Sequence, residues 1–268
     1  LFFCCCCSFF TPSVVVVMVV EVRVVGVVGV VATSTESTYF TGLEVQPDGK
    51  VVAAGARIVG GFDFQCVVAR LTAAGALDTG FDTDGLVQFD ANLAEGGTHN
   101  EIDQIWDVKL APDGGILLVV ESEQASFDSR YFLVRLNRSN GAFDTAFGGN
   151  GVIATGVAGF PSKIEVQGDG RILASGGTSG FNALVIRRNA NGTADTTWDG
   201  DGLWTSTLTS NANGLHSAPD GRVYASALDN AFTGGSAHVY AFEGNAVVSH
   251  TTLSPADNAT GVGVDDSL

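Results

Sequence analysis

The chain has 268 residues, of which 45% are hydrophobic and 16% are charged, and its formal net charge is −16. This excess of acidic residues repels nucleic-acid phosphates and anionic membrane surfaces, so we expect no nucleic-acid partner. Glycine is abundant, with 35 residues, and proline is scarce, with 6. The composition is too apolar for a disordered chain and predicts an all-β protein with many tight turns.

Residues 1–28 form an apolar, low-complexity segment with four consecutive cysteines, Cys4 to Cys7. The cysteine spacing fits neither a zinc site nor a disulfide framework. The first 20 residues carry no charge, which is close to the length that spans a bilayer. Because Pro12 interrupts the run and no basic region precedes it, the edge of a fragment is favoured over a signal sequence or anchor. Contact with a membrane is expected only if residues 1–20 are an anchor.

An Asp-Gly hairpin signal recurs four times along the rest of the chain. Each Asp-Gly lies between two short apolar runs, and glycine accepts the positive φ that a tight hairpin turn requires. Successive aspartates are 65, 56 and 51 residues apart. The repeated aspartates are Asp48, Asp113, Asp169 and Asp220.

Two more strands are expected after the hairpins. Four short strands in a repeated unit are typical of a β-propeller blade, which needs neighbours to bury its faces. A β-sandwich is the competing fold, and the long repeat period argues against it. The sequence therefore predicts a β-propeller-like array of about four four-stranded antiparallel blades over residues 29–248. The expected third strands are 66–71, 132–136, 183–187 and 237–242, and the expected fourth strands begin at Leu86, Val152 and Leu203.

The first unit carries a motif that extends beyond the hairpin. It reads LEVQPDGKVVAAG over residues 43–55, and it continues with ARL at 69–71 and LDTGF at 77–81. In order and spacing the units resemble the delta-60 repeat of bacterial β-propellers, although the fourth unit lacks the Asp-Thr that would follow Phe242. The resemblance implies a large exported or surface-attached protein and no known catalysis. The array is either a whole small propeller or part of a larger ring, and the broken unit before residue 29 favours the larger ring.

Residues 249–268 differ from the repeats and are expected to begin with a linker. The last part, SPADNATGVGVDDSL, resembles the opening of a bacterial Ig-like domain of the surface-layer type. This resemblance implies that other domains of the same chain are partners. It also implies an extracellular location at the bacterial surface.

Two glycine-rich loops carry pairs of aspartates, Asp82 with Asp84 and Asp199 with Asp201. Carboxylate oxygens in such a loop are ligands that calcium prefers. The loops lack the EF-hand spacing, and aspartate also favours turns by bonding its own backbone. We expect turn chemistry here, with a calcium site as the alternative and no other cofactor.

An Asp-Thr turn recurs in three units, each time with an arginine a few residues before it. A ring of binding sites would repeat in this way, and so would a structural pair. Because a catalytic group is usually needed only once, we expect each aspartate to cap its turn and to pair with the arginine. The pairs are Arg70 with Asp78, Arg135 with Asp144, and Arg187 with Asp195.

The insert at residues 91–106 is the best place for an added binding loop. It holds Glu95, His99, Glu101 and Asp103, and a plain polar loop is the simpler interpretation. The chain has no serine-hydrolase elbow, no histidines at metal-ligand spacing and no phosphate-binding glycine loop.

These observations predict a non-catalytic scaffold, structural or adhesive, in an exported bacterial surface protein. It would present its blade loops to a glycan or to another protein. The alternatives are an extracellular carbohydrate-active enzyme on the same fold and a pure spacer module.

Overall fold

The computed structural model describes residues 38–60, 63–91, 102–124, 128–229, 236–244 and 246–253, with the short pairs 19–20 and 29–30. Within these ranges all the named elements are β-strands, and none of these residues belongs to a helix long and apolar enough to cross a bilayer. The remainder of segment 1–28 and the Ig-like tail from 254 lie outside the described residues. In the short pairs, β2 (Gly29–Val30) pairs with β1 (Val19–Val20), and the described part of the first blade starts at Thr38; the expected start of the repeats at residue 29 stays a prediction.

The first blade is a separate antiparallel sheet whose four strands follow the chain order. Its central strands are apolar and β-branched, as expected for strands buried on both faces. The strands are β3 (Thr38–Val45), β4 (Val51–Gly60), β5 (Asp63–Leu71) and β6 (Leu86–Phe89).

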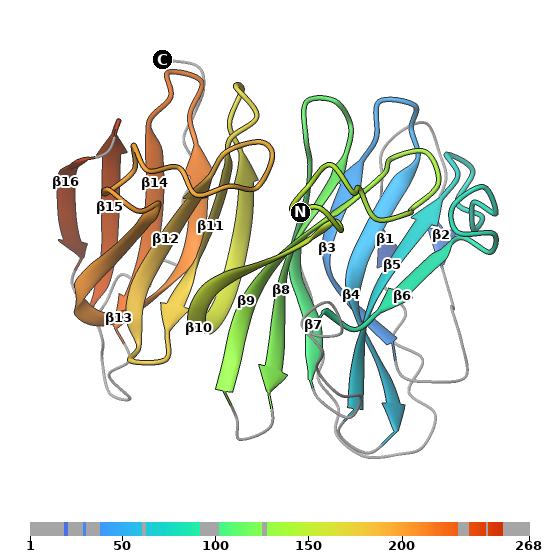
Figure 1. Ribbon diagram of the computed structural model, residues 1–268, viewed down its shortest axis with the longest axis horizontal. Helices are drawn as coiled ribbons and strands as arrows, with labels where there is room; N and C mark the ends of the chain where they lie inside the picture. The colour runs from blue at the N-terminus through green and yellow to red at the C-terminus, as the bar shows by residue number, and fades with distance from the viewer. Residues whose placement is uncertain are drawn as a thin grey trace.

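The next ten strands form one continuous antiparallel sheet in chain order (Figure 1). They are β7 (Asp103–Leu110), β8 (Ile116–Gln124), β9 (Asp128–Leu136), β10 (Val152–Val166), β11 (Ile172–Thr178), β12 (Asn182–Arg188), β13 (Leu203–Ser217), β14 (Val223–Asp229), β15 (Ala237–Glu243) and β16 (Ala246–Leu253).

Two long strands divide this sheet into blades. The first half of β10 pairs with β9, and the second half, from Gly159 onward, pairs with β11. In the same way β13 pairs with β12 up to Thr209 and with β14 from Ser210. Each long strand is therefore the outermost strand of one blade and the innermost strand of the next, which gives three more blades of four strands.

The Asp-Gly turns join the first two strands of every blade, at the top of Figure 1. Their glycines have φ between 82° and 88°, which disfavours any side chain. In each turn the aspartate Oδ1 also accepts a hydrogen bond from the amide two residues later, at 2.9–3.2 Å. Strands β6, β10 and β13 begin at the predicted residues Leu86, Val152 and Leu203.

The fourth blade ends later than the boundary at residue 248 that the sequence suggested. Strand β16 pairs with β15 along its length, from Glu243 opposite Ala246 to Ala237 opposite Leu253. The turn between them is tight, with Gly244 at φ 62°, and it replaces the Asp-Thr turn of the other blades. The fourth strand therefore follows the third directly.

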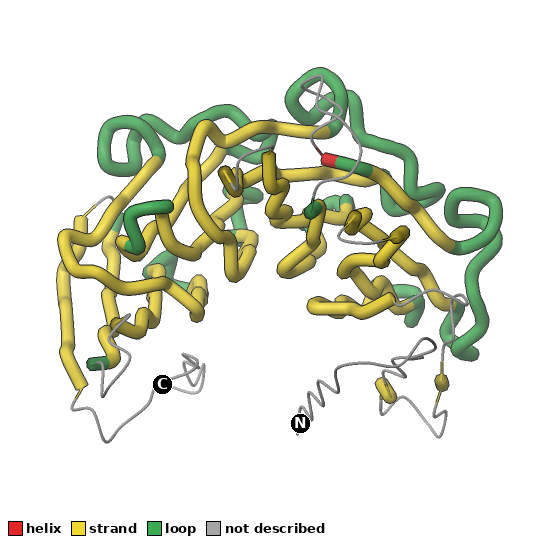
Figure 2. Tube along the Cα trace, turned by 90° about the horizontal axis from the view of Figure 1, so that it is seen from below, coloured by secondary structure: helices red, strands yellow, loops and turns green. Residues whose placement is uncertain are grey.

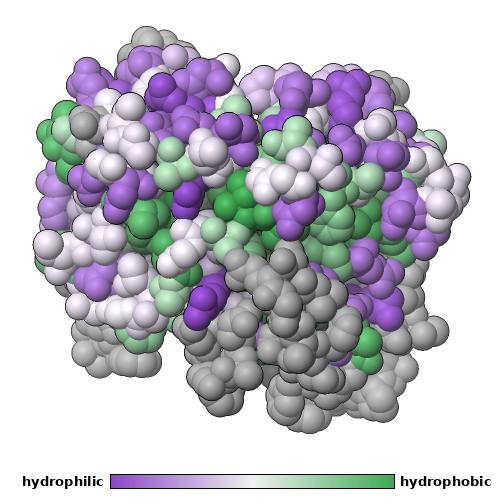
Figure 3. All heavy atoms as spheres, in the orientation of Figure 1, coloured by the Kyte–Doolittle hydropathy of each residue, from purple (hydrophilic) through white to green (hydrophobic). Residues whose placement is uncertain are grey.

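The core lies between successive blades. Along β8, Leu118 and Val120 face the first blade, whereas Leu117 and Val119 face the third, and all four are fully buried. The first strands of successive blades also contact one another, and Figure 2 shows the blades following an arc. Hydrophilic side chains gather at the end with the Asp-Gly turns, and hydrophobic ones lie near the middle of this face (Figure 3). The architecture confirms the predicted β-propeller-like array of four four-stranded blades.

Candidate functional site

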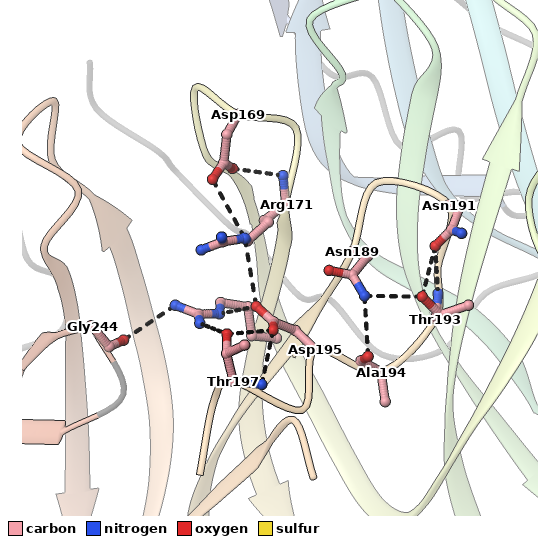
Figure 4. Close-up of polar contacts among 10 residues, drawn as sticks. Asp169, Arg171, Asn189, Asn191, Thr193, Ala194, Asp195, Thr197 and Gly244 are labelled. Atoms are coloured by element: carbon pink, nitrogen blue, oxygen red, sulfur yellow. Dashed lines mark hydrogen bonds and ion pairs between the residues drawn. The ribbon is translucent and has the colours of Figure 1, made fainter. Parts of the chain in front are cut away.

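The recurring arginine and aspartate lie in contact within the third blade (Figure 4). Arg187 Nε donates to Asp195 Oδ2 at 2.7 Å, and Asp195 Oδ1 accepts from the amide and the hydroxyl of Thr197 at 3.0 and 2.6 Å. Arg171 connects the pair to the hairpin, with its Nε 3.5 Å from Asp195 Oδ2 and 3.4 Å from Asp169 Oδ2. Each carboxylate thus caps a turn and pairs with a cation.

The same arrangement occurs in the first and second blades. In the fourth blade Asp220 contacts Arg222 at 3.8 Å, and Ala241 stands where the other blades have the arginine. The equivalent contacts are Arg70 Nε to Asp78 Oδ2 at 2.8 Å, Lys50 Nζ to Asp78 Oδ2 at 2.9 Å, Lys50 Nζ to Asp48 Oδ2 at 3.9 Å, Arg135 Nε to Asp144 Oδ2 at 2.8 Å, and Arg135 Nη2 to Asp113 Oδ2.

Two of these arginines also join neighbouring blades. Arg70 Nη2 donates to the carbonyl of Ser139 at 2.9 Å, and Arg187 Nη1 donates to that of Gly244 at 3.2 Å. The guanidinium carbons lie 4.5 Å from the ring centres of Phe81 and Trp198, respectively. These contacts engage the guanidinium groups inside the protein, which favours a structural role for the pairs.

Charged side chains at matching positions of the inner strands form a second link between blades. Lys109 Nζ lies 3.1 Å from Glu44 Oε1 and 3.7 Å from Glu165 Oε1, which belong to the blades on either side. Nearby, Lys163 Nζ is 3.8 Å from Asp107 Oδ2. Burial raises the pKa of Glu165 and that of Asp107, although the lysines act in the opposite direction.

The aspartate-rich loops adopt the turn geometry that the sequence favoured. Asp82 and Asp199 have φ of 45° and 46°, in the left-handed region that aspartate tolerates. Asp84 Oδ1 accepts from the amide of Leu86, and Asp201 Oδ1 from that of Leu203, both at 2.9 Å. No group of three or more metal-binding side chains occurs in the part of the chain that the structure describes. Calcium binding stays a prediction for experiment.

The expected binding loop is largely outside the described residues, which exclude Glu95, His99 and Glu101. Asp103, which was expected in this loop, lies at the start of a strand instead. It is the first residue of β7, is paired with Ser122 across the sheet and is only 2% exposed. The sequence indicated this strand by its apolar end near Leu110, whereas the strand begins seven residues earlier. Asp103 therefore cannot present its side chain as a loop residue would.

The structure brings together a set of residues that sequence reasoning did not single out. A hollow of about 190 Å³ opens between the outer strands of the third and fourth blades. Hydroxyl and aromatic side chains dominate it, and none of the described residues that line it is Asp, Glu, Lys or Arg. The lining residues are Trp204, Thr205, Ser206, Thr207 and Leu208 of β13, Tyr240 of β15 and His250 of β16.

An aromatic group fixes one wall of the hollow. The rings of Tyr240 and His250 are stacked, with centroids 4.5 Å apart and planes at 5°, and Trp204 meets Tyr240 edge-on at 4.8 Å. The Tyr240 hydroxyl lies 3.0 Å from Ser206 Oγ, which also accepts from the amide of Leu208 at 3.0 Å. These contacts hold the wall in place before any ligand arrives, which lowers the entropy cost of binding.

A carboxylate–histidine chain, in which His238 is buried and Asp229 is partly exposed, contacts His250. His238 is 4% exposed, with its Nε2 2.8 Å from Asp229 Oδ1 and its Nδ1 3.1 Å from His250 Nε2. Because an ionised carboxylate only accepts, Nε2 of His238 carries a proton. When His238 is neutral, its Nδ1 accepts a hydrogen from His250 or from the Thr252 hydroxyl, 3.2 Å away. Donation by His250 Nε2 leaves His250 Nδ1 as an acceptor.

The size and lining of the hollow limit what it can hold. Ligand pockets for drug-sized molecules usually measure about 300–1,000 Å³, so this hollow suits a single ring or side chain. Aromatic faces pack against C–H groups, and the hydroxyls and His250 can exchange hydrogen bonds with a polyhydroxylated ring. The chain's net charge of −16 disfavours an anionic ligand.

One comparison, with a family model, agrees with the β-propeller fold. Residues 46–81 match the family described as a domain of unknown function (DUF5122) beta-propeller. No curated protein matches the chain. A solved structure titled a putative exo-beta-1,3-galactanase from Bifidobacterium bifidum s17 is similar at 13% identity and a TM-score of 0.42, over 74% of this chain and 65% of that one. Drosophila Plexin A in complex with Semaphorin 1b is similar at 10% identity and a TM-score of 0.29, over 75% and 51%. The chain thus spans less than two thirds of each.

Proposed function

We propose that this chain is a non-catalytic β-propeller scaffold of an exported bacterial surface protein, and that its hollow binds one ring of a neutral glycan. The observation that carries the proposal is the pre-formed wall of Trp204, Tyr240 and His250 beside the hydroxyls of β13. Such a wall offers both an apolar face and hydrogen-bonding groups, as the two sides of a sugar ring require.

The rest of the molecule supports a scaffold. The recurring ion pairs lie within three blades, and two of their arginines, Arg70 and Arg187, also donate to carbonyls of the next blade. Repeated packing of this kind gives a rigid body on which one boundary can carry a site. A carbohydrate-active enzyme is the alternative, and it would need a carboxyl pair aimed at the bound sugar. Among the residues that the structure describes, none that lines the hollow carries a carboxylate.

Isothermal titration calorimetry with neutral glucose- and galactose-based sugars tests the proposal. His250→Ala should weaken binding about tenfold, because it removes one hydrogen-bonding group and part of the wall. His250→Phe keeps a stacked ring without nitrogens and should lie between His250→Ala and the wild type. His216→Ala removes a histidine outside the hollow and is the matched control.

Two results would contradict the proposal. The first is that none of the sugars binds, or that His250→Ala binds as well as the wild type. The second is turnover: if incubation with the same glycans releases shorter products, the protein is an enzyme and the scaffold assignment fails.

A further inference from the structure

Phe181 is an exposed aromatic residue held in an unusual backbone conformation. It forms the turn between β11 and β12, with φ of 60° and 51% of its surface exposed. A bulky side chain rarely adopts positive φ, and Gly180, directly before it, would adopt the conformation readily. The turn is well anchored, because the Phe181 amide donates to the Thr178 carbonyl at 2.8 Å and its carbonyl accepts from the Ser210 amide at 2.7 Å.

The ring of Phe181 has support on one side. It stacks on Phe160 of β10, with centroids 6.2 Å apart and planes at 19°. One face of the Phe181 ring therefore packs on another aromatic ring, while about half of the residue's surface stays exposed to solvent. A residue that served only the fold would gain more from burial, and a residue that served only the turn would be glycine.

This turn is hydrogen-bonded to β13, the strand that supplies most of the lining of the hollow. Asn182 Nδ2 donates to the Leu208 carbonyl at 3.3 Å, and Leu208 is both a lining residue of the hollow and 38% exposed. The part of β13 from Leu203 to Asn213 contains no charged side chain and reads LWTSTLTSNAN. In a chain that is 16% charged, this stretch is an uncharged strip that exposes Thr205, Thr207 and Thr209, whereas Ser206 and Ser210 are buried. The strip meets the Phe181 turn at Ser210, whose amide donates to the Phe181 carbonyl.

We propose that Phe181 forms a second sugar contact, so that the strip of β13 holds a neutral oligosaccharide rather than an isolated monosaccharide. This inference rests on the proposed function of the hollow. The hollow, at about 190 Å³, accommodates one ring, and further rings would lie along the hydroxyl strip to Phe181.

The test measures affinity against chain length. Calorimetry with neutral glucose- and galactose-based oligosaccharides of one to about six rings should show tighter binding as the chain reaches Phe181. One added aromatic contact corresponds to a gain of about fivefold to tenfold. Phe181→Gly should abolish this gain and leave monosaccharide binding unchanged. Phe181→Tyr keeps the ring and should keep the gain.

The variants separate this role from a structural one. Glycine accepts a φ of 60° without a clash, so Phe181→Gly should fold with a melting temperature close to that of the wild type. Phe181→Asn tolerates the same conformation and gives a second variant without the ring. If either variant keeps the full dependence on chain length, the role of Phe181 is wrong while the hollow stands. If no sugar of any length binds, or if His250→Ala changes nothing, the hollow itself is wrong and this inference falls with it.

Discussion

Asp107 shows how one buried carboxyl sets the pH dependence of stability. Its Oδ2 accepts from the amide of Ile164 at 3.2 Å and lies 3.8 Å from Lys163 Nζ, but burial dominates and raises its pKa. Because the folded pKa is above the unfolded one, ionised Asp107 lowers stability at neutral pH, and this loss disappears as the pH falls through the raised pKa. We expect Asp107→Asn to raise the free energy of unfolding in urea at about pH 7 and to leave it unchanged at about pH 3.

Asp78 should behave with the opposite sign. The hydrogen bond from Lys50, together with the Gly80 amide and Arg70, lowers its pKa despite some desolvation. A lowered folded pKa stabilises the protein above the unfolded pKa, and this contribution is lost as the pH falls through the folded value. Asp78→Asn should therefore destabilise the protein at neutral pH and have a smaller effect in acid. If both variants shift the urea midpoint in one direction at neutral pH, the electrostatic assignment of one of them is wrong.

At the scale of single elements, the aspartate-rich loops offer a direct comparison between turn chemistry and calcium binding. In the second blade Asn150 Oδ1 accepts a hydrogen bond from the amide two residues later at 3.0 Å, as Asp84 Oδ1 does in the first blade. Asparagine is therefore compatible with this turn. We expect Asp84→Asn to change stability by less than about 0.5 kcal/mol, whereas Asp84→Ala should cost about 1 kcal/mol.

The same experiment addresses the cation. For the wild type and for Asp84→Asn alike, the thermal melt in calcium should coincide with the melt in excess chelator. The reason is that Asp84 Oδ1 and Asp201 Oδ1 already accept hydrogen bonds from backbone amides. A melting temperature that rises with calcium in the wild type, and not in Asp84→Asn, would establish a ligand role for these loops instead.

The sequence predicts elements best where local chemistry determines them. The Asp-Gly turns place the hairpins, and β6, β10 and β13 begin at the expected residues because each follows a glycine-rich loop. The sequence does not indicate that β10 and β13 each serve two blades. Their division depends on register shifts, such as the one between Ala154 and Ala158, which arise only when neighbouring strands pair.

The hollow was missed for a related reason. Tyr240 and His250 are direct cross-strand partners, as are His238 and Thr252, so the site exists only once β15 and β16 pair. The turn that joins these strands lacks the repeated motif, and the array was expected to end at residue 248. Recognising a tight turn at Gly244 would have placed both histidines on one face of a hairpin.

At the scale of the whole molecule, the described strands show each blade packing against the next one in the chain, so a substitution at one blade boundary should lower stability locally. Arg187 is the sharpest probe, because its 5% exposed side chain contacts Asp195, Thr197 and the Gly244 carbonyl of the next blade. Lysine keeps the charge but cannot donate from several nitrogens of a planar group, so Arg187→Lys should lower the free energy of unfolding by about 2 kcal/mol.

Hydrogen-exchange mass spectrometry of Arg187→Lys should show lost protection in β11–β16 and unchanged protection in β3–β6. The mirror variant Arg70→Lys should reverse this pattern, since Arg70 joins the first two blades through Ser139. Equal loss of protection across all four blades in both variants would mean that the array unfolds as one cooperative unit.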